Sequence, residues 1–266
     1  IDLANSMWKN GNETFDGTDN DGDGYADDVY GVNLITGSGD PQDDQGHGTH
    51  VAGIIAAQAG NGGSVGVAYG AQIMAIKAGQ STGTFAASDI AKGIRYAVDH
   101  GADVINMSFG GTGRSAVVEA ALADAFSTCV LVASAGNDGL PTTEALAYGY
   151  IRAEDIYPAG YNYVLGVMSC DGNGNLSIFS NWDYASGVGC EYELIAPGEN
   201  VYSTLPGDRY AKWSGTSMAA PEVSAAAAIV RSMNADKSKY TSRYIMGQLS
   251  SASDKSVAYP KLDILA

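Results

Sequence analysis

The sequence predicts an α/β fold in which one mostly parallel central sheet has helices on both faces. Two observations point to it. From about Gln58 onward, short apolar runs alternate with amphipathic stretches of helical length, and such alternation implies right-handed crossovers between parallel strands. The 266 residues contain no repeat, low-complexity tract or linker, so residues 1–266 are predicted to form a single domain.

Four buried strands are predicted from apolar runs, over Gln72–Ala78, Asp103–Phe109, Val130–Ser134 and Tyr163–Met168. Two helices are predicted between them, over Ser88–His100 and Ser115–Ser127. In the first helix the apolar residues recur at helical spacing, with Ser88 as N-cap and Gly101 as stop signal.

A third helix is predicted over Ser217–Met233, because this stretch of small residues is typical of a buried helix. Proline is tolerated only in the first turn of a helix, where the N–H groups have no partner. The position of Pro221 therefore places Ser217 at the N-terminus of this helix.

Residues 1–45 are polar, glycine-rich and dense in aspartate, and we predict that they form mainly loop. The whole chain has a formal charge of −16, which repels phosphate backbones and disfavours nucleic acid as a partner. The acidity suits either divalent-cation binding or simple solubility. No apolar run is long enough for a membrane span.

The three cysteines are too widely spaced for a metal cluster. Cys129 lies in an apolar run and is predicted to be core. Cys170 and Cys190 are a candidate disulfide, and such a bond would favour an oxidising compartment.

The segment Gly215–Pro221, GTSMAAP, is a candidate for nucleophilic catalysis. A serine at a helix start exposes its hydroxyl, and the backbone N–H groups and the positive end of the helix dipole there stabilise a developing oxyanion. Ser217 would need a base to take its proton. The alternative is that Ser217 is only a helix cap.

Three histidines are candidates for that base. His100 is predicted to end a helix, where a cation is favoured, and to be structural. His47 and His50 lie in His47–Gly53, HGTHVAG, at the start of another small-residue-rich helix. A metal shared by these two lacks a third ligand in the motif. We therefore favour His47 as an imidazole within hydrogen-bond reach of Ser217.

A further motif, Ser134–Gly139 or SAGNDG, follows an apolar strand. At the carboxyl edge of a parallel sheet, the amide of Asn137 could donate to a substrate oxyanion. Taken alone, the motif is equally an ordinary turn.

In chain order, these motifs together with Asn106–Gly111, NMSFGG, resemble the subtilisin-like serine proteases over essentially the whole chain. The resemblance implies a subtilisin-like three-layer fold and a serine endopeptidase, secreted or at the cell surface. It makes His47 the general base and Ser217 the nucleophile that forms an acyl-enzyme, with Asn137 donating to the oxyanion. A protein or peptide substrate is expected to add as a strand along Ser108, Phe109 and Gly110.

The third member of the family's triad, an aspartate on an early strand before Thr/Ser-Gly, has no counterpart here. Asp2 matches a later aspartate of the family pattern. Either the domain is N-terminally incomplete, or the protein is an inactive pseudoprotease. We favour the first, because a sheet without this central strand exposes its edges. The missing segment, or a propeptide, is then a candidate partner. Residues 1–266 alone are expected to have little activity, since the imidazole lacks its carboxylate.

The segment Asp19–Asp27 reads DNDGDGYAD. Calcium prefers several hard oxygen ligands, and alternate aspartates on a loop turned by glycine converge on one point. The predicted Ca²⁺ ligands are four carboxylates and one carbonyl, from Asp19, Asp21, Asp23, Asp27 and Tyr25, with Asp28 as a substitute. An EF-hand is not predicted, because Tyr30 stands where that motif needs glutamate.

By the same resemblance, Ile156 occupies a position at the base of the substrate pocket that is often glycine, so small residues are favoured before the cut. The following Tyr157–Pro158 bond is expected to be cis. A different class of function is a non-catalytic, calcium-dependent binding module. It would explain the acidity and the missing aspartate, but not the co-occurrence of the serine, histidine and asparagine motifs.

Overall fold

The computed structural model describes residues 2–183, 191–253 and 261–262. Within them, β1 (Gly31–Asn33) pairs in parallel with β2 (Ala75–Lys77). A separate parallel sheet has the order β3-β4-β5-β6, with β3 at Val104–Met107, β4 at Val130–Ser134, β5 at Leu165–Cys170 and β6 at Leu194–Pro197. An antiparallel hairpin joins β7 (Val201–Leu205) to β8 (Arg209–Trp213).

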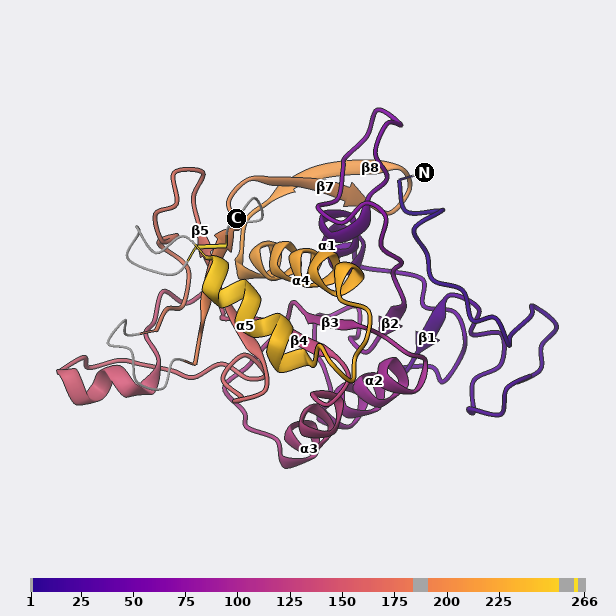
Figure 1. Cartoon of the computed structure of the whole chain (residues 1–266), viewed down its shortest axis with the longest axis horizontal. Coiled ribbons are helices and arrows are strands. Elements are labelled where there is room, and N and C mark those ends of the chain that lie inside the picture. The colour runs from indigo at the N-terminus through magenta and orange to yellow at the C-terminus, as the bar shows by residue number, and fades with distance from the viewer. Residues whose placement is uncertain (1, 184–190, 254–260, 263–266) are drawn as a thin grey trace.

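Helices cover the four-stranded sheet on both faces. Of the helices, α2 (Ala87–Asp99) and α3 (Ala116–Ala125) lie on one face, and α4 (Thr216–Met233) and α5 (Ser242–Ala252) lie on the other. In Figure 1, α2 and α3 lie below β3 and β4, and α4 lies above them. The helix α1 (His47–Ala56) packs against α4 and β7, and a 3₁₀ helix spans Thr143–Tyr148. Alternate residues of β4 point to opposite layers, as a pleated strand requires. Leu131 packs in a core with α2 and α3, whereas Val132 packs in a core with α4 and α5. The predicted three-layer α/β fold is therefore confirmed.

The predicted elements are present with ends shifted by a few residues, and β4 has the predicted bounds. Gly101 ends α2 with a φ of 79°, as expected for a left-handed stop. The prediction of Ser88 as N-cap is wrong, because α2 begins earlier and its N-cap is Ala86, which offers no side-chain cap.

Four strands, β1, β6, β7 and β8, together with the 3₁₀ helix and α5, lie in segments for which no element was predicted. Cys129 is fully buried, as predicted. Cys170 is a buried free thiol among the described residues. Its suggested disulfide partner, Cys190, lies outside the described residues, so the disulfide stays a prediction. No helix in the described part of the chain is both long and apolar enough to cross a membrane.

Candidate active site

The predicted nucleophile, oxyanion donor and substrate strand meet at the carboxyl end of the four-stranded sheet. Ser108 directly follows β3, Asn137 lies three residues after β4, and Ser217 is the second residue of α4. The helix α4 packs against both of these strands. The parallel topology thus brings together three residues that are far apart in the sequence.

Two hydrogen bonds join Ser108 to Ser217. The Ser217 Oγ donates to the Ser108 carbonyl at 3.1 Å, and the Ser108 Oγ donates to the Ser217 carbonyl at 2.9 Å. The prediction that Pro221 lies in the first helical turn is wrong, because α4 begins at Thr216 and the proline falls in the second turn. Proline has no N–H for the carbonyl four residues before it, which is that of Ser217. The Ser108 hydroxyl supplies the missing donor.

The side chain of Asn137 is oriented by the start of α4. Its Oδ1 accepts from the Thr216 backbone N–H at 2.8 Å and from the Thr216 hydroxyl at 3.0 Å. The Thr216 hydroxyl in turn accepts from the Gly136 N–H at 3.2 Å. Because the carbonyl end of the amide is occupied, the Nδ2 donors face away from Thr216, where they can meet a substrate oxygen.

His47 is the first residue of α1, which packs against α4. Val51 and Ile54 of α1 form a buried cluster with Met218, the neighbour of Ser217. Burial lowers the pKa of the His47 imidazole, and the negative charge of Asp43 opposes this shift. The structure therefore brings the two helix starts together and favours a neutral imidazole. In the described residues, however, the Ser217 hydroxyl is bonded to Ser108 and not to His47.

Asp43, a residue without a sequence-based assignment in the site, organises the start of α1. Its carboxylate accepts from the N–H groups of Gly46 at 2.7 Å and Thr49 at 2.8 Å, and from the Thr49 hydroxyl at 2.6 Å. Burial alone would raise the pKa of Asp43, but these hydrogen bonds outweigh it and the pKa is lowered. Asp43 is therefore an ionised cap that holds His47 in place.

His50 is structural. It is fully buried, its Nε2 lies 3.1 Å from the Ala211 carbonyl, and its ring stacks on Trp213 with centroids 4.6 Å apart. Burial lowers the pKa of its imidazole. The ring of His47 lies parallel to Trp213 at a centroid distance of 6.4 Å. No described group of three metal-ligating residues includes His47 or His50.

Ile156 lies directly against Gly110, the last of the three residues predicted to bind the substrate. The ring of Phe109 stacks on Phe85 at 4.4 Å. A Cβ added to Gly110 would lie 2.4 Å from the Ile156 Cγ2, and one added to Gly136 would lie 2.9 Å from its Cγ1. Ile156 is only 4% exposed. It is thus clamped between two glycine backbones that approach as closely as glycine allows. The Tyr157–Pro158 bond is cis, as predicted.

Three aspartates of the predicted calcium loop belong to two groups of possible metal ligands, one with Asp19 and Asp21 and the other with Asp23. Ligand atoms of Asp19 and Asp21 lie within 4.8 Å of each other and of Glu13, which the sequence-based set omits. Asp27 instead accepts from the N–H groups of Asp16 and Gly17, both at 2.8 Å. Each group offers carboxylate oxygens, the donors that calcium prefers. The carboxylates of Glu13, Asp19 and Asp21 therefore fit a hard cation, whereas no described group of three includes Asp27.

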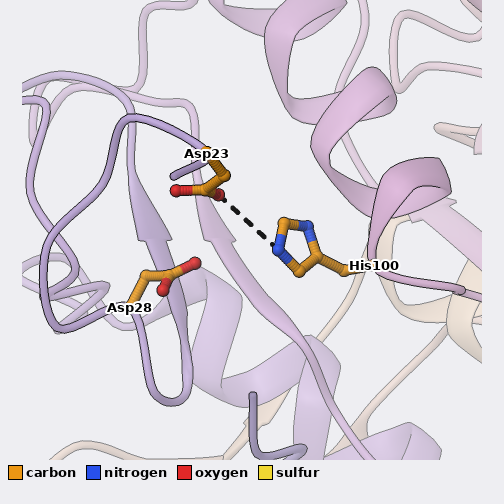
Figure 2. A group of neighbouring side chains, drawn as sticks. All are labelled: Asp23, Asp28 and His100. Atoms are coloured by element: carbon orange, nitrogen blue, oxygen red, sulfur yellow. Dashed lines mark ion pairs between the residues drawn. The ribbon is translucent and has the colours of Figure 1, made fainter. Parts of the chain in front are cut away.

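The second group consists of Asp23, Asp28 and His100 (Figure 2). The imidazole projects from the end of α2 toward the loop, and its Nε2 lies 3.5 Å from the Asp23 carboxylate. Asp28 is fully buried and accepts a hydrogen bond from the Tyr96 hydroxyl. Burial and the charges of neighbouring aspartates raise the pKa of Asp23. His100, predicted to be structural, thus joins α2 to the acidic loop.

Comparison with known proteins gives one consistent result. A family model described as the subtilase family matches residues 1–261. Subtilisin DY of Bacillus licheniformis is 40% identical over 205 residues, which are 77% of this chain and 70% of the relative. The major intracellular serine protease of Bacillus subtilis (strain 168) is 44% identical over 193 residues, or 71% of this chain and 56% of the relative.

Among solved structures, the chain is similar to a cold adapted subtilisin-like serine proteinase. The TM-score is 0.76 at 26% identity, and the match covers 98% of this chain and 86% of that chain.

Proposed function

The chain belongs to the subtilase family and is a subtilisin-like serine endopeptidase, and we propose that His47, Ser217 and Asn137 are its catalytic residues. The observation that carries this assignment is the hydrogen-bonded arrangement of Ser108, Asn137 and Ser217 at the N-terminus of α4. An alternative role for Ser217 as a helix cap is disfavoured, since α4 begins at Thr216 and the cap position is Gly215, which has no side-chain cap.

In the proposed reaction, the Ser217 hydroxyl turns from the Ser108 carbonyl to the neutral imidazole of His47. The imidazole takes the proton while the oxygen attacks the substrate carbonyl carbon. The Asn137 Nδ2 and the Ser217 N–H stabilise the resulting oxyanion. The imidazolium then protonates the leaving amine, and water releases the acyl group from Ser217 by the reverse path. A carboxylate is needed to orient His47, and Asp43 does not fill this role because it caps α1.

The substrate is proposed to be an extended peptide that lies along Ser108, Phe109 and Gly110. The strand-ending position of these residues suits backbone pairing with an added strand. Because Ile156 fills the space behind Gly110, small side chains are favoured before the cut.

Calcium is proposed to bind the acidic loop. Asp19, Asp21, Asp23, Asp27 and the Tyr25 carbonyl are the ligands predicted from the sequence, and Glu13 supports Asp19 and Asp21 by its proximity. The cation would offset the mutual repulsion of the loop's carboxylates and keep it packed on α2. We also propose that the protein acts outside the cell; its detection in culture medium, and not in washed cells, tests this.

The catalytic assignment is tested with protein that is expressed from its native gene in the organism of origin. A fluorophosphonate probe is expected to label Ser217, as located by mass spectrometry, and casein hydrolysis is expected to disappear in Ser217→Ala. The matched control is Ser232→Ala, an exposed serine on the same helix, which should leave both signals unchanged. A folded protein that neither reacts with the probe nor cleaves casein would refute the assignment.

A further inference from the structure

The loop that carries Asn137, residues 136–140, is held from two sides. On one side, the start of α4 binds it through the hydroxyl and the backbone N–H of Thr216. On the other side, residues 179–182, which follow β5 in the chain, pair with the loop and its continuation. The Gly139 N–H, for example, donates to the Phe179 carbonyl at 2.8 Å. The position of the proposed oxyanion donor therefore depends on both neighbours.

Asn181 binds this loop with its side chain and is fully buried. Its Oδ1 accepts from the Asp138 N–H at 2.9 Å and from the Leu140 N–H at 3.1 Å. Its backbone N–H donates to the Gly136 carbonyl at 2.9 Å. Two of these bonds hold the residues directly before and after Asn137. They therefore fix the backbone from which the Asn137 side chain projects.

The side chain of Asn181 has one defined orientation and a rigid support. Both groups that face its Oδ1 are N–H donors, so the flipped amide would set donors against donors. The preceding residue anchors it to the central sheet: the Ser180 hydroxyl accepts from the Ser169 N–H of β5 at 2.9 Å and donates to the Asn181 carbonyl at 2.8 Å. A residue held in this way can transmit the geometry of the sheet to the loop.

The donor half of the Asn181 amide is not satisfied. Its Nδ2 is buried and has no hydrogen-bond partner among the described residues. It lies against Gly136, where φ is 102° and an added Cβ would lie 2.6 Å from this nitrogen. A buried donor without an acceptor lowers stability. Packing alone therefore does not account for an amide at this position, whereas the acceptor oxygen has a defined task at the loop.

We propose that Asn181 is a positioning residue for peptide hydrolysis: its Oδ1 holds the loop so that the Nδ2 of Asn137 stays aimed at the substrate oxyanion. The inference rests on the proposed function, because Asn181 acts only through Asn137. An oxyanion donor works when it is already in place as the charge develops. A displacement of about 1 Å can lower a rate about 100-fold.

The test uses protein expressed from its native gene and steady-state hydrolysis of a peptide substrate. Asn181→Ala is expected to lower kcat and kcat/KM by the same factor, about 10- to 100-fold, because the lost interaction is made only in the transition state. The matched control is Asn175→Ala, which removes an exposed asparagine of the same connection whose amide binds Asp171. It should leave kcat unchanged.

A conservative variant separates positioning from stability. Asn181→Asp keeps an acceptor for the Asp138 and Leu140 N–H groups, so it should recover most of kcat. Its melting temperature should stay below that of the unmodified protein, because it buries a carboxylate. A purely structural role would instead make kcat and melting temperature fall together in this variant, and that result would count against the proposal.

A double-mutant cycle then tests whether Asn181 acts through Asn137. Asn137→Ala should lower kcat about 100- to 1000-fold, the range known for loss of an oxyanion donor in subtilisin. In that background Asn181→Ala should lower kcat by no more than about twofold, because no donor is left to position. If Asn181→Ala does not fold, Asn181→Ser takes its place in the same cycle.

The outcomes distinguish this inference from the catalytic assignment. If Asn137→Ala lowers kcat but the factor for Asn181→Ala is the same in both backgrounds, or if Asn181→Ala leaves kcat unchanged, the positioning role is refuted and the assignment of Asn137 stands. If Asn137→Ala leaves kcat unchanged, the assignment of Asn137 is refuted, and the role of Asn181 with it.

Discussion

The hydroxyl of Ser108 donates to the carbonyl of Ser217 at the position where Pro221 withholds the helical N–H. This bond ties the proposed substrate-binding residues to the backbone of the proposed nucleophile. It also lets proline occur inside α4 without leaving a carbonyl unpaired, and so it couples local helix chemistry to the geometry of the site.

Removing the Ser108 hydroxyl should destabilise the fold. We expect Ser108→Ala to lower the free energy of unfolding by about 1–3 kcal/mol, because the Ser217 carbonyl then lacks a donor. Urea denaturation measures the change. Pro221→Ala restores a helical N–H for the same carbonyl, so the loss caused by Ser108→Ala should be smaller in that background. Strictly additive effects in this double-mutant cycle would show that the two donors do not serve one carbonyl.

The imidazole of His47 should titrate below the ordinary range of histidine. Burial lowers its pKa, and Asp43 partly offsets the shift. A lowered pKa means that the folded state binds this proton less readily than the unfolded chain. The contribution of His47 to stability therefore declines as the pH falls below the ordinary histidine pKa of about 6.5. NMR titration of the ring nitrogens measures the midpoint.

A variant isolates the effect of the neighbouring charge. Asp43→Asn should move the His47 midpoint to still lower pH, whereas Asp40→Asn, an exposed residue on the same loop, should leave it in place. A midpoint that rises in Asp43→Asn would contradict the electrostatic account.

Chelation should weaken the acidic loop. EDTA is expected to lower the melting temperature, because the loop's carboxylates then repel one another without a cation. Asp21→Ala combined with Asp23→Ala should remove the difference between calcium and EDTA. Asp40→Ala combined with Asp124→Ala changes the net charge equally outside the loop and should retain it. A melting temperature insensitive to EDTA in the unmodified protein would rule out a stabilising calcium ion.

Ile156 should restrict the residue before the cut. The measurement uses protein expressed from its native gene and two substrates, with phenylalanine or alanine before the cut. Ile156→Ala is expected to raise the ratio of kcat/KM for the phenylalanine substrate to that for the alanine substrate, because space opens behind Gly110. The same change should cost about 2–5 kcal/mol of stability, as for other buried isoleucines. Ile156→Val, a smaller reduction, should give an intermediate ratio. An unchanged ratio in both variants would place the pocket elsewhere.

Glu193 should make stability fall as the pH rises from about 4.5 to about 8. Burial raises the pKa of its carboxyl to about 8, while the Gly166 N–H that donates to it opposes the shift. A pKa raised by folding means that the native state holds the proton more tightly. Its contribution is present at pH below about 4.5 and is lost as the pH rises through about 8.

Urea denaturation between these limits tests that sign. Glu193→Gln should reduce the decline in unfolding free energy with rising pH, and Glu119→Gln, on the surface of α3, should not. An unfolding free energy that rises with pH and loses that rise in Glu193→Gln would mean that the carboxylate is favoured by folding.

The sequence alone identified the residues proposed to carry the chemistry and most of the elements that hold them. The motifs around His47, Asn137 and Ser217 were identifiable because each combines a reactive side chain with small residues at the end of a strand or the start of a helix. The parallel order of β3 and β4 followed from alternating apolar and amphipathic stretches, since this periodicity is a local property of the chain.

Tertiary structure decided which groups meet. The pairing of Ser108 with Ser217 and the clamping of Ile156 between Gly110 and Gly136 join residues distant in sequence, so no local pattern reports them. His100 reaches the acidic loop for the same reason.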